Sequence, residues 1–230
     1  MERGGFPEPF LAIERQDSDR WRMQYIDGIV GTDLLSFEKI NDLRAIQLTL
    51  ELLRNRVGSP LSFKSIAEDV GCSPHTIKRY IEILEALYIV FRVTPYSRNI
   101  ARSLLKEPKI YFYDTGLIQG NDGVCFENLV AVSLLKHVNA IEDYEGRKAG
   151  LHYLRTKEKK EVDFCVVEEE VAPLLMEVKL SDQSVDASLK YFHRKYHFKS
   201  IQVVKHLRQE FLSGKIEVRK GVDFLRSLQL

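Results

Sequence analysis

Residues Glu161–Lys179 read EVDFCVVEEEVAPLLMEVK, two stretches of alternating side chains joined by a short acidic turn. Such alternation is typical of β-strands, because successive side chains of a strand point to opposite faces of the sheet. One face of the first strand is then formed by Val162, Phe164 and Val166. The other face is formed by Glu161, Asp163 and Cys165. We therefore predict a β-hairpin at the centre of the C-terminal half.

A hairpin centred on Glu170 places Asp163 opposite Glu177 and Glu161 opposite Lys179. Opposed side chains lie about 5 Å apart on one side of the sheet, so two carboxylates and an ammonium converge there. Like charges so close destabilise the sheet unless a cation binds between them, and Mg²⁺ takes one or two carboxylates from a protein. This pattern predicts a Mg²⁺ or Mn²⁺ site at Asp163 and Glu177. The alternative is a solvated hairpin face with ordinary cross-strand pairs.

Length and composition limit the class of protein. The chain has 230 residues, of which 44% are hydrophobic and 29% charged, and this length favours two domains. With a formal net charge of +1, binding to nucleic acid must come from local patches. The three cysteines lack zinc-ligand spacing, which favours reduced thiols in a cytoplasmic protein. We expect no membrane association, because neither a signal peptide nor an apolar run of about 18 residues is found.

The segment upstream of the hairpin has the pattern of a helix–turn–helix. Ser62 is placed to cap a helix over 63–70, and Ser73 precedes a proline at the start of the second helix. The buried face of the second helix is expected to hold Ile77, Ile81, Leu84 and Tyr88. Strands predicted over 89–94 and 109–113, with the loop between them, complete a winged helix. An earlier helix is predicted over 37–56 with Ser36 as its N-cap.

Side chains near the start of the second helix are those from which a recognition helix contacts DNA. They are His75, Thr76, Lys78 and Arg79, and the wing adds Arg98 and Arg102. Against DNA binding, Glu82 and Glu85 on the same helix would repel phosphates, and Lys78 has Glu82 within pairing distance along the helix. A role in protein docking is therefore left open beside DNA contact.

The C-terminal half is predicted to follow the order α-β-β-β-α-β. The expected elements are a largely buried helix 126–139, a strand 151–156, the two hairpin strands, a helix 184–196 and a strand 200–205. A strand 216–219 and a closing helix 222–228 follow. Glu127 lies in the first turn of the first helix, where an acidic residue is ordinarily favourable to the helix dipole.

The spacing of Asp163, Glu177 and Lys179, D-x(13)-E-x-K, in this order of elements resembles the PD-(D/E)XK nuclease superfamily. The resemblance implies an α/β (α+β) fold with a restriction-endonuclease-like domain after the winged helix. It also implies that Asp163, Glu177 and the backbone carbonyl of Val178 ligate Mg²⁺. Lys179 would orient the attacking water, and Glu127 would join the site. Val162 stands where the superfamily has a proline.

Six features resemble, in order, the C-terminal part of a prokaryotic AAA+-type ATPase family: GGFPEPF at 4–10, VGSPLS at 57–62, the helix–turn–helix that ends in Leu84-Glu85, KIYFYD at 109–114, FENLV at 126–130 and EVK at 177–179. Members carry a P-loop ATPase, a winged helix and a nuclease-like domain of unknown function. Because GxxxxGK[ST] is missing here, we expect no ATP hydrolysis from this chain alone and an ATPase domain as partner, in cis or in trans. Residues 1–36 would be a remnant of the ATPase lid, 37–113 the winged helix and 114–230 the nuclease-like domain.

Two functions follow from these patterns. The first is a Mg²⁺-dependent DNA nuclease that a winged helix brings to DNA. The second is a non-catalytic DNA- or protein-binding regulatory module of the ATPase, with a vestigial nuclease fold. The presence of Asp163, Glu177 and Lys179 together favours the first. Homo-oligomerisation is left open by the sequence.

Overall fold

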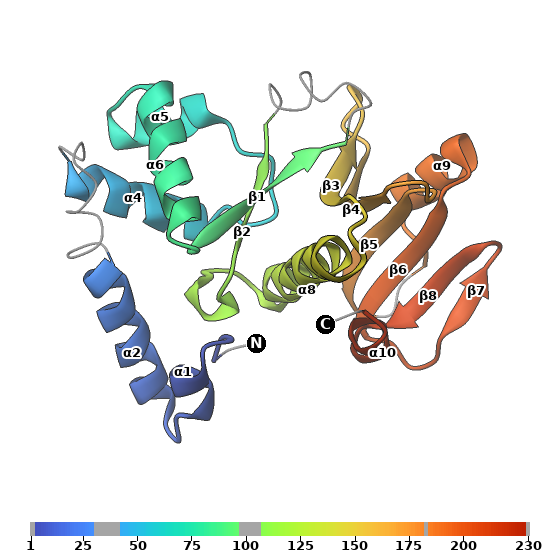
Figure 1. Ribbon diagram of the computed structural model, residues 1–230, viewed down its shortest axis with the longest axis horizontal. Coiled ribbons are helices and arrows are strands. Elements are labelled where there is room, and N and C mark those ends of the chain that lie inside the picture. Colours follow the sequence, from blue (N-terminus) through green and yellow to red (C-terminus); the bar gives the residue numbers. More distant parts are fainter. Residues whose placement is uncertain (1–2, 30–41, 97–106, 182–183, 229–230) are drawn as a thin grey trace. The chain divides into compact units, whose positions relative to one another are not determined.

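The computed structural model describes residues 3–29, 42–96, 107–181 and 184–228 (Figure 1). The fold is mixed α/β, as predicted. The chain forms two compact units, one from Met1–Arg92 with Lys109–Asn121, and the other from Val93–Pro108 with Asp122–Leu230. All five candidate nuclease residues belong to the second unit, and the helix–turn–helix belongs to the first.

The N-terminal segment joins the first unit through Asp114. Helices α1 (Pro7–Leu11) and α2 (Arg15–Gly28) follow Gly5, whose N–H donates to Oδ1 of Asp114 at 2.9 Å. The Asp114 carboxylate also lies 3.5 Å from Nε of Arg22, and both side chains are buried. Gly4 has a φ of 69°, and a Cβ there would come within 1.8 Å of the same carboxylate. The expected ATPase-lid remnant is thus built into the first unit.

The helix–turn–helix is present as α5 (Phe63–Val70) and α6 (Pro74–Ala86), which pack against α4 (Leu43–Arg54). The predicted caps are confirmed, since the Ser62 side chain accepts from the N–H of Ser65 and the Ser73 side chain from the N–H of Thr76. Between them Gly71 ends α5 in the left-handed conformation, with a φ of 78°.

Two expectations for these helices need correction. Helix α4 begins at Leu43, because Asp42 accepts a hydrogen bond from the N–H of Ala45 and caps it. The predicted cap Ser36 lies outside the described residues. Tyr88 is 69% exposed, contrary to prediction, because α6 ends at Ala86 and Tyr88 adopts a φ of 55°.

Strands β1 (Val90–Pro95) and β2 (Lys109–Phe112) follow the helices as predicted, and they are neighbours. The N–H of Tyr113 donates to the carbonyl of Ile89 at 3.1 Å. The wing residues Arg98 and Arg102 lie outside the described residues.

The second unit is built on a mixed sheet. Its strands are β3 (Ala149–Arg155), β4 (Glu161–Glu168), β5 (Leu174–Ser181), β6 (Lys199–His206), β7 (Phe211–Ser213) and β8 (Ile216–Lys220). Strands β3, β4 and β5 are antiparallel, β5, β6 and β8 are parallel, and β7 pairs antiparallel with β8 at the edge. The order helix, β3, β4, β5, helix, β6 is the predicted one, whereas β7, only three residues long, was not predicted.

Helices cover both faces of this sheet (Figure 1). Helix α9 (Ala187–Tyr196) places Leu189 and Phe192 in a buried cluster with Cys165, Leu175 and Val204 of the sheet. Helix α8 (Asp122–Glu145) packs against β3, β4 and β5, and α10 (Gly221–Arg226) closes the unit. By length and composition α8 also meets the criteria for a membrane span, a test that the core helix of a folded domain passes as well.

Candidate functional site

The hairpin register is the one predicted from the sequence. Phe164 pairs with Met176, and Val166 pairs with Leu174, which centres the turn on Glu170. Glu170 itself has a φ of 65°, a left-handed conformation suited to a tight turn. This paired ladder ends at Phe164 and Met176. The candidate acidic residues therefore lie just beyond it, where backbone groups become available to side chains.

Asp163 and Glu177 are linked at this point by two hydrogen bonds between backbone and side chain. The N–H of Asp163 donates to Oε2 of Glu177 at 3.4 Å. The N–H of Val178 donates to Oδ2 of Asp163 at 2.9 Å. The predicted convergence of the two carboxylates is thus present, and each carboxylate is oriented by the backbone of the opposite strand.

A β-bulge at Asp163 accounts for this geometry. On the other side of β4, His152 pairs with Cys165 and Leu154 pairs with Val162, so β4 has one residue more than β3 between these pairs. Bulges re-aim side chains and occur preferentially beside active sites. The strict alternation that we predicted is therefore wrong here, and Val162 lies in the same buried cluster as Cys165.

Burial and charge set the protonation of Glu177. The residue is only 6% exposed, and burial, together with the nearby charge of Asp163, raises its pKa to about 8, although the Lys179 ammonium acts in the opposite direction. For Lys179, burial lowers the pKa, but Glu177 and Asp186 outweigh that effect and raise it. Lys179 is therefore charged at neutral pH, whereas burial favours the protonated form of Glu177.

The expected pair between Glu161 and Lys179 is not formed. Lys179 Nζ lies 2.6 Å from Oε1 of Glu177 and 3.3 Å from Oδ2 of Asp186. Glu161 instead lies 3.6 Å from Arg155, which is its partner across β3 and β4. The prediction failed because it considered one neighbouring strand, whereas β4 has strands on both sides.

Sequence reasoning missed two polar residues beside this site. Asp186 is the N-cap of α9, accepting from the N–H of Ser188 at 2.7 Å while it contacts Lys179. The predicted helix start at Ser184 is corrected accordingly. Gln202 on β6 pairs in register with Glu177, is fully buried, and accepts from the N–H of Asp186 at 2.8 Å. A glutamine inside an apolar strand was the signal that could have revealed it.

The donor set fits a hard divalent cation. Mg²⁺ prefers carboxylate oxygens, keeps several waters, and usually takes one or two carboxylates from the protein, as Asp163 and Glu177 can supply. Within the described ranges, no three His, Cys, Asp or Glu side chains gather closely enough to hold a metal. Glu127 is half-buried in α8, and its role, like that of the Val178 carbonyl, stays a prediction.

The predicted DNA-contacting residues of α6 differ in exposure. His75, Lys78 and Arg79 are exposed, whereas Thr76 is half-buried, with its hydroxyl 2.9 Å from that of Ser73. Lys78 lies 3.8 Å from Glu82 in the expected helical pair. The other acidic residue of concern, Glu85, accepts from Nε of Arg92 at 2.8 Å, which partly neutralises it.

Two family descriptions match the chain. "Domain of unknown function (DUF8612)" matches residues 1–123, and "Domain of unknown function (DUF4143)" matches residues 122–220. The two matches meet at residues 122–123, and the longer segment of the second unit also begins at Asp122.

Relatives are found in bacteria and archaea. An uncharacterized protein of Mycobacterium tuberculosis is 27% identical over 71% of this chain and 38% of its own length. Uncharacterized proteins of Methanocaldococcus jannaschii and Haemophilus influenzae are each 24% identical, over 83% and 96% of this chain. The chain covers 44% and 56% of their lengths, so it spans about half or less of the curated relatives it matches.

One solved structure is similar to part of the chain. It is a half-complex from a tetradecameric assembly of Thermococcus gammatolerans McrB AAA+ hexamers with bound McrC. The TM-score is 0.34 at 13% identity, over 46% of this chain and 32% of that chain. That likeness is too weak to bear on fold or function.

Proposed function

The chain belongs to the domain-of-unknown-function family DUF8612, and from that premise we propose that it is a DNA-processing module whose second unit is a divalent-cation-dependent nuclease. The observation that carries the proposal is the pair of carboxylates on Asp163 and Glu177, held together at a β-bulge with Lys179 beside them. A buried carboxylate facing a second one is costly, and a divalent cation between them would offset the repulsion.

In this proposal the second unit has the PD-(D/E)XK fold, and Asp163 and Glu177 hold Mg²⁺ or Mn²⁺. The cation supplies Lewis-acid polarisation of the phosphate and a more acidic bound water. Lys179 is held by Glu177 and Asp186 at 2.6 and 3.3 Å, so its ammonium is positioned before substrate binds. A fixed positive charge beside a phosphate stabilises the charge that develops in the transition state.

The first unit would then act as a winged helix that brings the nuclease to DNA. Three exposed side chains on α6, His75, Lys78 and Arg79, supply the contacts, and the ion pair between Glu85 and Arg92 reduces the repulsion that Glu85 would exert on phosphates. An ATPase domain, in cis or in trans, is the proposed partner, and the greater length of the relatives leaves room for such a domain in them. We place this activity in the cytoplasm.

The test is a cleavage assay on supercoiled, linear, single-stranded and branched DNA with Mg²⁺ or Mn²⁺. We expect cleavage that depends on the metal and disappears in Asp163→Asn. Glu170→Gln, an exposed change in the turn of the same hairpin, is the matched control and should cleave normally. Metal-dependent cleavage that persists in Asp163→Asn would mean a contaminating nuclease, and no cleavage of any substrate would reject the proposal.

A non-catalytic binding module is the second candidate. The observation that favours it is the closed network of Glu177, Lys179 and Asp186, in which the ammonium already has carboxylate partners without a cation. A chain that binds DNA with the predicted α6 dependence, yet neither cleaves it nor binds Mn²⁺, would support this candidate.

A further inference from the structure

A second feature of the second unit lies at the other end of α9, away from its N-cap. A pocket of about 530 Å³ opens between the C-terminal part of α9 and the turn that joins β3 to β4. Its lining combines aromatic rings, among them Tyr96, Phe192 and Tyr196, with the cationic side chains of Arg155, Lys157 and Lys195. Its volume is that of a site for a small molecule or for a few groups of a larger one.

Three aromatic side chains near this pocket form a stack that is partly open to solvent. The Tyr196 ring lies nearly parallel to both of its neighbours, 6.0 Å from Phe192 at an interplanar angle of 16° and 5.5 Å from Phe198 at 17°. Despite these contacts, Tyr196 is 42% exposed. The exposed part of the Tyr196 ring is a surface against which another planar group can stack.

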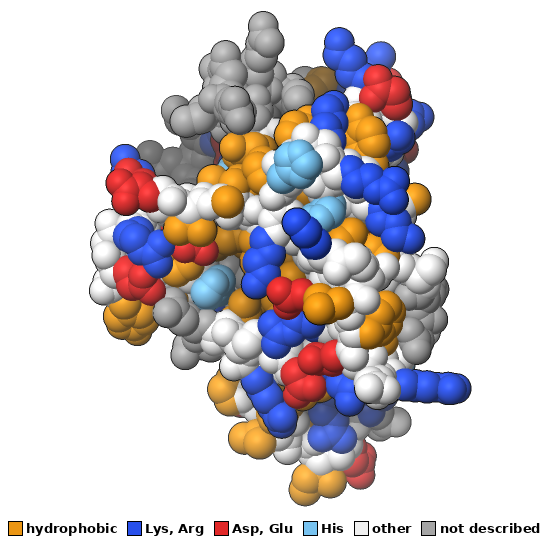
Figure 2. Space-filling view, turned by 90° about the vertical axis from the view of Figure 1, so that its right-hand side faces the viewer, with side chains coloured by type: hydrophobic (Ala, Val, Ile, Leu, Met, Phe, Trp, Pro, Cys, Tyr) orange, Lys and Arg blue, Asp and Glu red, His pale blue; other side chains and the backbone are white. Residues whose placement is uncertain are grey.

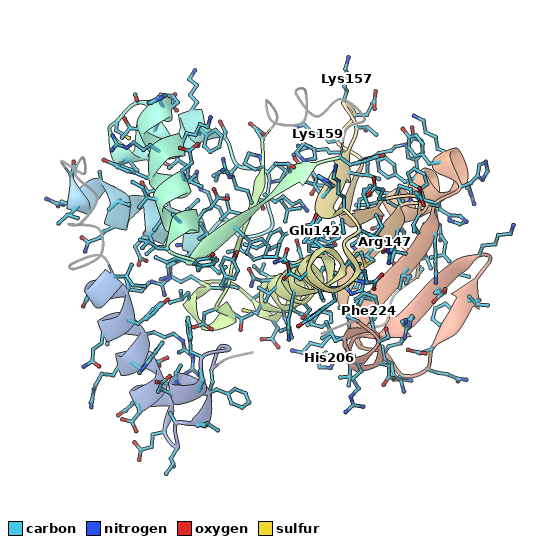
Figure 3. All side chains as sticks on the ribbon, in the orientation of Figure 1. Glu142, Arg147, Lys157, Lys159, His206 and Phe224 are labelled. Carbon is cyan, nitrogen blue, oxygen red and sulfur yellow. The ribbon has the colours of Figure 1, made fainter. Side chains whose placement is uncertain are left out.

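Lysine ammonium groups lie close to Tyr196 and to the neighbouring Tyr191. Lys160 Nζ lies 3.8 Å from the centroid of the Tyr191 ring, and Lys195 Nζ lies 5.3 Å from that of Tyr196. Lys157 and Lys159 extend from the turn between β3 and β4 (Figure 3). On the face shown in Figure 2, Lys and Arg side chains are interspersed with hydrophobic ones. The pocket lining holds three cationic side chains, Arg155, Lys157 and Lys195, and one carboxylate, Glu158, so its formal charge is positive although the whole chain is nearly neutral.

Stacking rings bordered by cations match the chemistry of unpaired nucleotides, whose bases have flat faces and whose backbone is anionic. A base-paired duplex keeps its bases stacked on each other and cannot use the Tyr196 ring in this way. We propose that this pocket binds single-stranded nucleic acid, with a base on Tyr196 and phosphates near Lys157 and Lys195.

The pocket adjoins the proposed nuclease strand through Arg155. This residue lines the pocket and pairs at 3.6 Å with Glu161, which is two positions from Asp163 on β4. A strand bound here therefore lies beside the chain segment that carries the catalytic carboxylate. The inference deepens the proposed function and rests on it for the fate of the bound strand, whereas the binding itself needs no metal.

The experiment measures fluorescence anisotropy of a labelled oligo-dT in EDTA, where cleavage cannot occur. Tyr196→Leu keeps an apolar side chain against Phe192 and Phe198 but removes the ring, and we expect binding weakened roughly tenfold or more. Tyr196→Phe should bind like wild type. Lys157→Ala, in an exposed turn, should lower the slope of log K against log salt by roughly 0.7 if it binds one phosphate.

Controls come from the β7–β8 hairpin, which has an exposed aromatic residue and an exposed lysine of its own. Phe211→Leu and Lys215→Ala should leave binding unchanged. No binding of oligo-dT, equally weakened binding in these controls, or preference for duplex DNA or an acidic peptide would each overturn the inference. Binding with the expected dependence on Tyr196 and Lys157 but no cleavage in Mn²⁺ would reject only the nuclease. Cleavage of single strands that is indifferent to Tyr196 and Lys157 would reject only this site.

Discussion

The ammonium of Lys179 lies 2.6 Å from Oε1 of Glu177, a carboxylate that is almost completely buried. Burial of a charge is costly unless the charge is paired, and here the pairing is opposed by Asp163, which repels the same carboxylate. The protonation state of Glu177 therefore depends on both the Lys179 ammonium and the Asp163 carboxylate. It can be measured without knowing the substrate.

Stability should fall with rising pH because of Glu177. Burial and Asp163 raise its pKa from 4.5 to about 8, so between these values the folded protein binds more protons than the unfolded chain. The stabilisation is complete below pH 4.5 and is lost as the pH rises through about 8. As the pH rises from about 5 to about 8.5, the free energy of unfolding of Glu177→Gln should increase relative to that of wild type by on the order of 1–3 kcal/mol. Denaturant unfolding at both pH values measures this, and Glu170→Gln, which should behave like wild type, is the control.

Metal binding should depend on both carboxylates. Asp163→Asn and Glu177→Gln should each weaken the affinity for Mn²⁺ by roughly tenfold or more, that is, by at least about 1.4 kcal/mol. Calorimetric titration near pH 7 should also detect proton release on binding to wild type, because Glu177 must ionise to act as a ligand. Equal Mn²⁺ affinity in wild type and both variants would show that these carboxylates do not form a metal site.

Lys179 should matter for turnover more than for binding. Because its charge acts mainly in the transition state, Lys179→Ala should cut the cleavage rate by about 100-fold or more while DNA binding changes little. Lys215→Ala removes an exposed cation from the β7–β8 hairpin, away from both proposed sites, and serves as the control for the loss of a positive charge. Rates are measured at saturating DNA with melting temperatures in parallel. If Lys179→Ala cleaves as fast as wild type, the role proposed for the ammonium is wrong.

The salt dependence of duplex binding tests α6. Replacing Lys78 and Arg79 by alanine should lower the slope of log K against log salt by about 0.9 for each phosphate that the helix no longer binds. Lys64→Ala on α5, whose exposed side chain pairs only loosely with Glu68 at 3.9 Å, is the matched control. An unchanged slope in the double variant would assign α6 to protein docking.

The buried pair of Arg22 and Asp114 should dominate the stability of the first unit. Asp114→Ala leaves a buried guanidinium without this carboxylate and also removes the acceptor for the N–H groups of Gly5 and Gly116, so we expect a loss of about 3 kcal/mol. Asp19→Ala removes a carboxylate that also contacts Arg22 but is 56% exposed, and should cost less than about 1 kcal/mol. Similar destabilisation by the two substitutions would contradict this ranking.

Local patterns predicted much of this fold. The caps at Ser62 and Ser73 and the hairpin register around Glu170 were correct, because each depends on residues a few positions apart. The order of elements in the second unit was also correct, except that β7 was not predicted. The predicted starts of α4 and α9 were wrong, because the side chains of Asp42 and Asp186 accept hydrogen bonds from the first-turn N–H groups and cap these helices.

For the candidate site, too, the sequence predicted one part and the tertiary structure determined the rest. Alternation and turn length were sufficient to bring Asp163 and Glu177 together, since both residues belong to one hairpin. The bulge at Asp163, the pairing of Glu161 with Arg155, and the positions of Asp186 and Gln202 beside Lys179 and Glu177 depend on β3, α9 and β6. Contacts between elements so far apart in the chain follow from the packing of the whole sheet, and no short-range periodicity encodes them.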